Sequence, residues 1–383
     1  MSGSNTQGDP LYGWLALALT PGIGPVSRRR LLDHFGSVEA LFRAEPGTLS
    51  AVAGDARAHA LTRPDTQREQ HIERALAWAQ APNHHLLTPS DPRYPQALLQ
   101  IADPPAVLFV AGRPEMLSRP MLAVVGSRNA TADGAANARA FAHSISQAGW
   151  TVVSGMALGI DAAAHDGALL GGCGTVAVLG TGVDVIYPSR HRPLAARIIE
   201  DGALVSEFAL GTAPVAGLFP RRNRLIAGLV RGVLVVEAAL KSGSLITAQL
   251  AADFGRDVFA IPGSIHSPVS RGCHALIRQG AQLVESAQDI LSQYPSQDPP
   301  PPTSPAQPGR SAGAGSPTAA PPDDPALART LTAIGHAPIL PDLLADHLGL
   351  APGEVGAHLV MLELAGLLER RSDGRVVRSV PAN

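Results

Sequence analysis

Short apolar runs alternate with helical segments through the middle of this 383-residue chain, and this alternation limits the possible folds more than any other feature. Continuous apolar runs of this length are typical of strands buried on both faces of a sheet. Strands that alternate with helices predict a doubly wound parallel sheet, with the carboxyl ends of its strands at one edge. The predicted strands are Met121–Val125, Thr151–Val153, Thr175–Leu179, Ala203–Ser206, Val233–Val236 and Val258–Ile261. The predicted helices between them are Ala130–Gln147, Asp161–Leu170, Pro193–Glu200, Leu225–Val230 and Leu245–Phe254.

Helical patterns precede the sheet. We expect residues 1–80 to form a helical domain, and its Gly22-Ile23-Gly24 turn resembles that of a helix-hairpin-helix unit. Such a turn can bind DNA phosphates through backbone N–H groups, but it is as often a packing module. Short apolar pieces around Pro104-Pro105, within Leu98–Val110, predict a connecting segment and an edge strand. The sheet domain is expected to span residues 81–294.

A proline-rich stretch follows the sheet. Residues 295–325 consist largely of Pro, Ser, Ala, Gly and Gln, so they cannot bury a core and predict a linker. Beyond it, the pattern indicates three helices and a hairpin signal at Ser372-Asp373-Gly374. The predicted helices are Ala326–Ile334, Leu340–Leu348 and Glu354–Leu364. This order predicts a winged-helix-like domain over residues 326–383.

Charge and cysteine content exclude several classes of protein. The formal net charge is −2, so a nucleic-acid site has to be a local basic patch. Cys173 and Cys273 provide neither a disulfide framework nor metal-ligand spacing. The chain shows no signal-peptide pattern and no apolar run long enough to cross a bilayer. We therefore expect a cytoplasmic protein without a membrane partner, a metal or a cofactor.

Hydrogen-bond donors follow several of the predicted strands. Gly126-Ser127-Arg128 comes directly after the first strand. It combines a glycine, a hydroxyl and a guanidinium, and the guanidinium can bind phosphate through two parallel hydrogen bonds. Ser154-Gly155 repeats this arrangement after the second strand. The full G-x-G-x-x-G pattern is missing, so no dinucleotide fingerprint is present.

The stretch from Phe219 to Thr247 carries the densest set of donors. Arg221, Arg222, Asn223 and Arg224 precede a predicted helix, and Lys241, Ser242, Gly243 and Ser244 open the next one. Helix N-termini attract anions through their free N–H groups and their dipole, so a phosphate site is predicted here. The structural alternative is a solvated helix start followed by a tight turn at Gly243.

Several carboxylates and a histidine also lie near strand ends. We expect Asp161 to cap a helix and His165 to form a local hydrogen bond. Glu207 and Glu237 each follow a strand, where each could be a catalytic carboxylate or a clamp for a nearby arginine. No set of nucleophile, base and orienting group is recognisable, and neither is a phosphate-binding lysine motif. Several donor-lined loops at one edge suit a ligand with several phosphates, such as single-stranded nucleic acid, with Phe219 as a stacking partner for a base.

Four of these motifs together resemble the DprA (also called Smf) family of DNA-processing proteins. They are G-S-R at Gly126–Arg128, S-G-M-A-L-G-I-D at Ser154–Asp161, F-P-R-R-N-R-L-I-A-G-L at Phe219–Leu229 and S-G-S-L-I-T-A at Ser242–Ala248. The resemblance covers roughly residues 89–294. Where the family usually has G-x-N before the last helix of the sheet domain, this chain has Gly272-Cys273-His274.

The resemblance implies an extended Rossmann-like domain that binds single-stranded DNA, with a helical N-terminal and a winged-helix-like C-terminal domain. It also implies a non-catalytic recombination mediator that protects incoming strands, loads the RecA recombinase in natural transformation and forms a homodimer through the Rossmann-like domain. The residues implied to meet the strand are Gly126, Ser127, Arg128, Ser154, Gly155, Phe219, Arg221, Arg222, Asn223, Arg224, Lys241, Ser242, Gly243 and Ser244.

Two alternatives remain at this point. The same sheet also resembles that of phosphoribohydrolases, which would use Glu207 or Glu237 together with Arg128 to hydrolyse a nucleoside monophosphate. Alternatively, the terminal domains bind duplex DNA, with Arg370, Arg371, Arg375 and Arg378 forming a basic wing.

Overall fold

The computed structural model of the chain describes residues 9–294, 324–334, 339–370 and 374–378. Its contacts divide the chain into two compact units, Met1–Pro301 and Pro302–Asn383. The predicted linker lies almost wholly outside the described residues, as do Arg371 and the first two residues of the predicted Ser372-Asp373-Gly374 turn. The domain boundaries predicted at residues 80 and 294 stay predictions.

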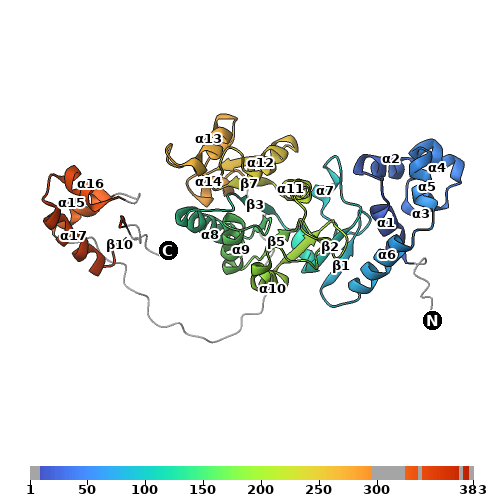
Figure 1. The fold of residues 1–383 in the computed structure, drawn as a ribbon, viewed down its shortest axis with the longest axis horizontal. Helices are drawn as coiled ribbons and strands as arrows, with labels where there is room; N and C mark the ends of the chain where they lie inside the picture. Colours follow the sequence, from blue (N-terminus) through green and yellow to red (C-terminus); the bar gives the residue numbers. More distant parts are fainter. Residues whose placement is uncertain (1–8, 295–323, 335–338, 371–373, 379–383) are drawn as a thin grey trace. The chain divides into compact units, whose positions relative to one another are not determined.

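A nine-stranded sheet forms the centre of the first unit, in the order β1-β2-β6-β5-β4-β3-β7-β8-β9 (Figure 1). All neighbours from β6 to β9 in this order pair in parallel, whereas β2 pairs antiparallel with both β6 and β1. The strand order reverses beside β3, because β4, β5 and β6 extend to one side and β7, β8 and β9 to the other. The strands are β1 (His84–Leu87), β2 (Leu108–Gly112), β3 (Met121–Val125), β4 (Thr151–Ser154), β5 (Thr175–Val178), β6 (Ala203–Ser206), β7 (Gly232–Val235), β8 (Asp257–Ala260) and β9 (Gln282–Leu283).

The predicted parallel sheet is confirmed, and its six predicted strands lie within one residue of β3 to β8. The prediction of an edge strand within Leu98–Val110 is wrong. That segment contributes β2, which has a partner on each side, and the edge belongs to β1. The two histidines of β1, His84 and His85, obscure its strand pattern in the sequence.

Helices cover both faces of the sheet. The apolar side chains of α8, α9 and α14 pack against one face, and those of α11, α12 and α13 pack against the other. The remaining elements are α10 and three short 3-10 helices, together with α7. Their bounds are α7 (Gln96–Leu99), α8 (Ala132–Gln147), α9 (Ile160–Gly171), α10 (Arg192–Asp201), α11 (Leu218–Leu229), α12 (Gly243–Asp253), α13 (Arg271–Arg278), α14 (Ala287–Leu291), η2 (Pro114–Ser118), η3 (Ser189–His191) and η4 (Pro268–Ser270).

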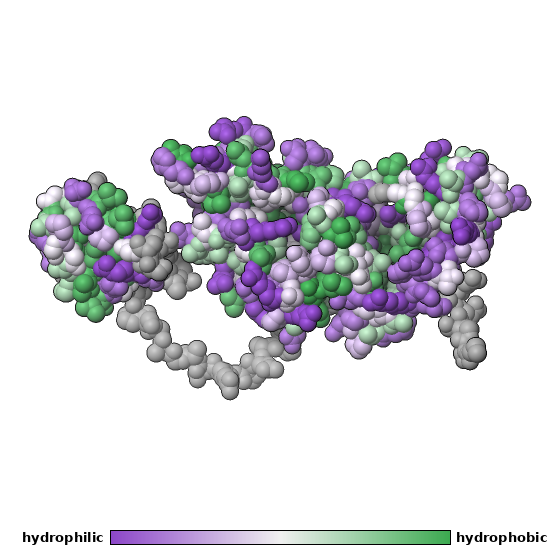
Figure 2. Space-filling model, viewed as in Figure 1, coloured by the Kyte–Doolittle hydropathy of each residue, from purple (hydrophilic) through white to green (hydrophobic). Residues whose placement is uncertain are grey.

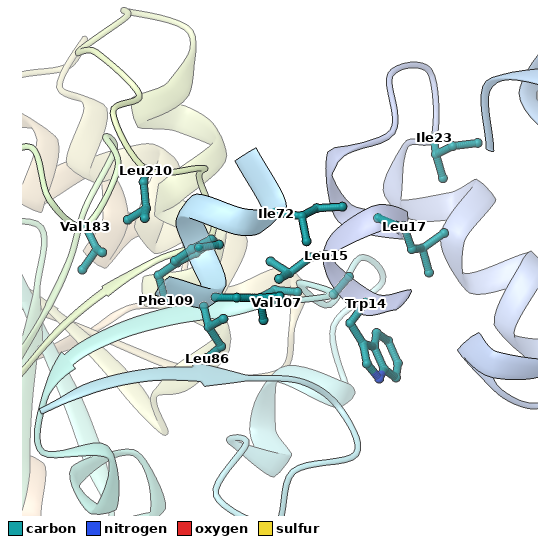
Figure 3. Close-up of a cluster of buried hydrophobic side chains, with 14 of the residues drawn as sticks. Trp14, Leu15, Leu17, Ile23, Ile72, Leu86, Val107, Phe109, Val183 and Leu210 are labelled. Carbon is teal, nitrogen blue, oxygen red and sulfur yellow. The ribbon is translucent and has the colours of Figure 1, made fainter. Parts of the chain in front are cut away.

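The N-terminal helices pack on the β1 and β2 side of the same unit. Leu15 and Ile72 lie over Phe109, in one continuous cluster of buried apolar side chains (Figure 3). Gly22, with a φ of 79°, forms the turn between the first two helices, where a side chain would strain the backbone. The helices are α1 (Pro10–Leu19), α2 (Pro25–Phe35), α3 (Val38–Arg43), α4 (Pro46–Ala53), α5 (Asp55–Thr62) and α6 (Thr66–Ala79).

The second unit has its own small core. Its elements follow the order of the predicted winged-helix-like domain. Three helices and a two-stranded antiparallel hairpin surround residues such as Leu331, Leu344 and Leu359. The elements are α15 (Pro325–Ile334), α16 (Pro341–Leu348), α17 (Pro352–Leu364), β10 (Leu368–Arg370) and β11 (Val376–Arg378).

Candidate nucleic-acid interface

A groove of about 730 Å³ lies at the carboxyl ends of β3 and β7, the two neighbouring strands at which the strand order reverses. Open α/β sheets bind their ligands at this position, because the loops after the two strands separate there. The groove is lined by the loop after β3, the beginning of α11 and the beginning of α12. Ten of the fourteen predicted site residues line it: Gly126, Ser127, Arg128, Phe219, Arg222, Asn223, Lys241, Ser242, Gly243 and Ser244.

The loop after β3 packs closely against Ile160 and Glu237. A side chain at Gly126 would collide with Ile160 and with the carbonyl oxygen of Glu237, at 2.7 and 2.8 Å. The carboxylate of Glu237 accepts hydrogen bonds from the backbone N–H and the hydroxyl of Thr131, at 3.0 and 2.6 Å. Glu237 is therefore a clamp for this loop, and its partner is a threonine instead of the arginine expected from the sequence.

Arg128 extends from this loop over an aromatic ring. Its guanidinium carbon lies 5.5 Å from the centroid of Phe219, within the range of a cation–π interaction. The ring of Tyr187 lies 5.9 Å from that of Phe219, and Tyr187 is 48% exposed. Phe219 also packs over Gly180, where a side chain would approach its ring to 2.7 Å. The groove thus combines a cation with two neighbouring aromatic rings.

Tyr187 was not among the sequence-based candidates. It stands in the segment after β5, between the glycine-rich Gly180-Thr181-Gly182 and the basic Arg190-His191-Arg192, neither of which was counted among the donor loops. The signal that could have identified it is an aromatic residue after a strand end at the same edge of the sheet as the donor loops.

The start of α12 supplies the second cationic part of the groove. Ser242 is the N-cap residue of α12, and its hydroxyl accepts a hydrogen bond from the N–H of Ser244 at 3.4 Å. The side-chain amide of Asn223 donates to the carbonyl oxygen of Gly243 at 3.3 Å, which links α11 to this turn. Lys241 is exposed beside it. Neither Lys241 nor Arg128 forms an ion pair with a carboxylate in the part of the chain that the structure describes.

The arginines of the predicted basic cluster point in different directions. We expected the cluster to precede a helix at Leu225–Val230, but α11 already begins at Leu218 and includes all three arginines. Because each residue of a helix is rotated by about 100° from the one before, Arg221, Arg222 and Arg224 cannot share one face. Arg221 is exposed outside the groove, with its guanidinium 5.4 Å from the ring of Phe208.

Arg222 is buried beneath the groove. Its guanidinium donates to the carbonyl oxygens of Gly155 and Val178, which joins the ends of β4 and β5. Burial lowers the pKa of Arg222 to about 10, against the raising effect of Asp161. Asp161 does not cap α9. Instead it accepts hydrogen bonds from the N–H groups of Gly155 and Ala157, both at 3.1 Å.

The predicted site residues Ser154 and Gly155 belong to the same buried network. The hydroxyl of Ser154 donates to the carbonyl oxygen of Val124 at 2.7 Å, inside the sheet. A side chain at Gly155 would collide with the guanidinium of Arg222 at 2.3 Å. Ser154, Gly155, Arg221 and Arg224 are the four predicted residues that do not line the groove.

Arg224 and Glu207 form a buried ion pair on the far side of α11. Arg224 also contacts the carboxylate of Asp103 at 2.9 Å and donates to its carbonyl oxygen at 2.8 Å. Burial raises the pKa of Glu207, and Arg224 opposes this rise. Glu207 is therefore a clamp for an arginine, which is one of its two predicted roles.

Two histidines near the sheet form hydrogen bonds within the fold. His165 is completely buried, and its Nδ1 lies 2.8 Å from the hydroxyl of Thr175. Burial lowers its pKa to about 3. His274, which departs from the usual family residue, has its Nε2 3.0 Å from the carbonyl oxygen of Gly263. Across the described ranges, no three His, Cys, Asp or Glu residues are grouped as a metal site, and no helix is long and apolar enough to span a bilayer.

The fold and the groove define a doubly wound α/β protein with a groove at the switch point of its sheet, and the groove carries donors suited to phosphate. The sequence family of DNA recombination-mediator protein A matches residues 85–295, and the DprA winged helix domain matches residues 314–374. The chain belongs to the DNA recombination-mediator protein A family, and the predicted resemblance is confirmed.

Relatives extend over nearly the whole chain. Protein Smf from Synechocystis is 35% identical over 396 residues, which cover 95% of this chain and 98% of that protein. The X-ray structure of DNA processing protein A from Streptococcus pneumoniae matches with a TM-score of 0.67 at 36% identity, covering 75% of this chain and 99% of that chain. DNA processing protein A from Helicobacter pylori, whose structure concerns its single-stranded DNA binding mode, matches with a TM-score of 0.50 at 29% identity, covering 55% of this chain and 95% of that chain.

Proposed function

We propose that this chain binds single-stranded DNA in the switch-point groove and acts as a non-catalytic recombination mediator that loads the RecA recombinase during natural transformation. The observation that carries the proposal is the combination of Arg128, Lys241 and the start of α12 with the paired rings of Phe219 and Tyr187. Cations and helix N–H groups suit phosphates, and exposed rings suit unpaired bases. The Helicobacter pylori relative, which binds single-stranded DNA, supports the same assignment.

The roles of the site residues follow from their positions. Arg128, Lys241 and the Ser242-Gly243-Ser244 turn are assigned to phosphates, and Phe219 is assigned to a base. Asn223 holds the turn through Gly243. Arg222 and Arg224, by contrast, are assigned to the framework, because both are buried, with Arg222 donating to carbonyl oxygens and Arg224 paired with carboxylates.

Nucleotide hydrolysis is the alternative function, and the positions of the carboxylates argue against it. A general base has to reach the attacking water with a free oxygen. The carboxylate of Glu237 is engaged by Thr131, Asp161 is buried beneath Arg222, and Glu207 is paired with Arg224 outside the groove. None of the three is available to activate water above Phe219.

Oligonucleotide length separates the two functions. We expect affinity to rise steeply from a mononucleotide to a thymidine oligomer that spans the groove, with no turnover of nucleoside monophosphates. Turnover that Glu237→Gln abolishes, together with affinity independent of length, would establish the hydrolase instead.

Recombinase loading needs a separate assay. RecA filament growth on a strand coated with single-strand-binding protein should accelerate when the wild-type chain is added. The Arg128→Ala variant should lose this effect in parallel with its DNA affinity. Unchanged filament growth with the wild-type chain would refute the loading role while leaving strand binding intact.

The proposed homodimer has a candidate edge. β9 ends the sheet, and its Leu283 is 46% exposed, whereas Val284 and Ile290 are fully buried core residues. An unpaired sheet edge with an exposed apolar side chain favours association with a second copy. Sedimentation should report a dimer for the wild-type chain and a monomer for Leu283→Glu, and an unchanged mass would assign the contact elsewhere.

A further inference from the structure

The third helix of the C-terminal unit has a composition that does not suit DNA. In helix-turn-helix proteins the recognition helix enters the major groove, and its neighbourhood supplies lysines and arginines for the phosphates. α17, the third helix of this unit, contains neither lysine nor arginine. Its charged residues are Glu354 and Glu363, whose carboxylates repel phosphate.

The outward face of α17 is apolar instead. Val360, Met361 and Leu364 are 50%, 56% and 80% exposed. Gly353 and Ala357 continue the same exposed stripe toward the start of the helix, at the spacing of one turn. The opposite face packs Val355, Leu359 and Leu362 into the core of the unit, so α17 is apolar on both sides. Figure 2 shows apolar side chains on the visible surface of this unit.

The same helix carries two exposed glutamates, Glu354 and Glu363. Arg370 of the hairpin lies 3.8 Å from Glu363, so part of the predicted basic wing is already paired with α17. The described residues of this unit include six carboxylates and four arginines. An apolar surface with an acidic rim is complementary to an apolar surface with a basic rim.

The segment that precedes the C-terminal unit does not supply a matching occupant. Residues 295–323 contain no valine, leucine, isoleucine, methionine or aromatic residue that could fill an apolar stripe. A second copy of the same face would bring Glu354 and Glu363 against their own counterparts, and like charges in an interface are unfavourable. Charge complementarity therefore favours a partner polypeptide with basic residues beside its apolar face.

We propose that the outward face of α17, formed by Val360, Met361 and Leu364, is a docking site for an amphipathic helix of a partner protein that carries lysine or arginine beside its apolar face. Helices commonly lay such an apolar face on a complementary surface, with anchors spaced by one turn. In this arrangement the C-terminal unit recruits a protein and leaves DNA binding to the groove in the first unit.

The test uses the full chain and two labelled synthetic helices, one of leucine and lysine and one of leucine and glutamate with the same spacing. We expect anisotropy to show binding of the leucine–lysine helix alone. The double variant Met361→Ser, Leu364→Ser should weaken this binding by roughly tenfold or more, because both anchors lose their apolar surface. The matched control is Leu170→Ser on α9, which removes a leucine that is 67% exposed in the first unit.

A charge variant gives an independent readout. Glu354→Lys should weaken binding of the leucine–lysine helix and strengthen binding of the leucine–glutamate helix. Three results would overturn the proposal: no binding of the leucine–lysine helix, an equal loss in the Leu170→Ser control, or binding of a duplex oligonucleotide that the Met361→Ser, Leu364→Ser variant abolishes. The last result would assign α17 to DNA.

Discussion

Arg128→Ala removes the cation that lies over the ring of Phe219 in the groove. Its guanidinium is exposed, has no carboxylate partner among the described residues, and lies 5.5 Å from the ring of Phe219. A phosphate that enters the groove can therefore bind it without first displacing a competing anion. The substitution should weaken single-stranded DNA binding and leave the fold unchanged.

The magnitude follows from the position of the side chain. A charge-assisted hydrogen bond to phosphate contributes about 1.5 to 3 kcal/mol. Because Arg128 is exposed and screened by salt, the lower end applies, about 1.5 kcal/mol or roughly tenfold in Kd. One lost phosphate contact should also reduce the slope of log K against log salt by about 0.7. The cation–π contact between Arg128 and Phe219 is present without DNA. Its loss therefore affects the free and the bound protein alike and changes the affinity little.

Anisotropy of a labelled thymidine oligomer, measured over a range of salt concentrations, checks both values. The matched control is Arg278→Ala, which removes an exposed arginine at the end of α13, away from the groove. We expect the control to bind as the wild type does. Equal affinity and equal salt slope in a folded Arg128→Ala protein would refute the assignment of phosphate to this groove.

Four further substitutions and one deletion test separate parts of the account. Phe219→Ala and Tyr187→Ala should each weaken oligonucleotide binding by about 1 to 3 kcal/mol, because bases stack on both rings. A lower melting temperature with unchanged affinity would instead show that the rings belong to the core. Arg222→Met should lower the free energy of unfolding by about 3 kcal/mol, because Asp161 stays buried without its cation, and a loss of affinity alone would contradict this role. Burial holds the pKa of His165 at about 3 in the folded protein, below its ordinary value near 6.5, so the unfolded chain takes up this proton first. Stability should therefore fall as the pH drops below about 6.5, by up to about 1.4 kcal/mol per pH unit, and denaturant unfolding of His165→Gln should lack this contribution. Deletion of residues 324–383 should leave the affinity for single strands unchanged, and a large loss would move the site to the C-terminal unit.

The sheet could be predicted from sequence because each central strand is apolar on both faces. A run such as Met121–Val125 fits only a strand that is buried on both faces of a sheet. The helices between such runs indicate that neighbouring strands are parallel. β1 escaped the prediction because an edge strand needs only one buried face, and His84 and His85 occupy its more exposed half. β9 has only two residues, both exposed, so it carries no pattern at all.

The groove was only partly predictable, because sequence order does not give side-chain direction. A run of arginines in Phe219–Arg224 looks uniform, but the helix turns Arg222 inward and Arg221 outward. The start of α11 could not be found precisely enough, since Pro220 lies in its first turn and a proline interrupts the helical signal there. Tyr187 joins the site only through the fold, which brings the segment after β5 beside Phe219.

The comparison of single-stranded with duplex DNA tests the central claim most directly. Anisotropy of one labelled oligonucleotide should be measured alone and annealed to its complement, over the same salt series. The account predicts strong preference for the single strand, because Phe219 and Tyr187 need unpaired bases, and a steep fall of affinity with salt. Equal binding of both forms, or preference for the duplex, would contradict it.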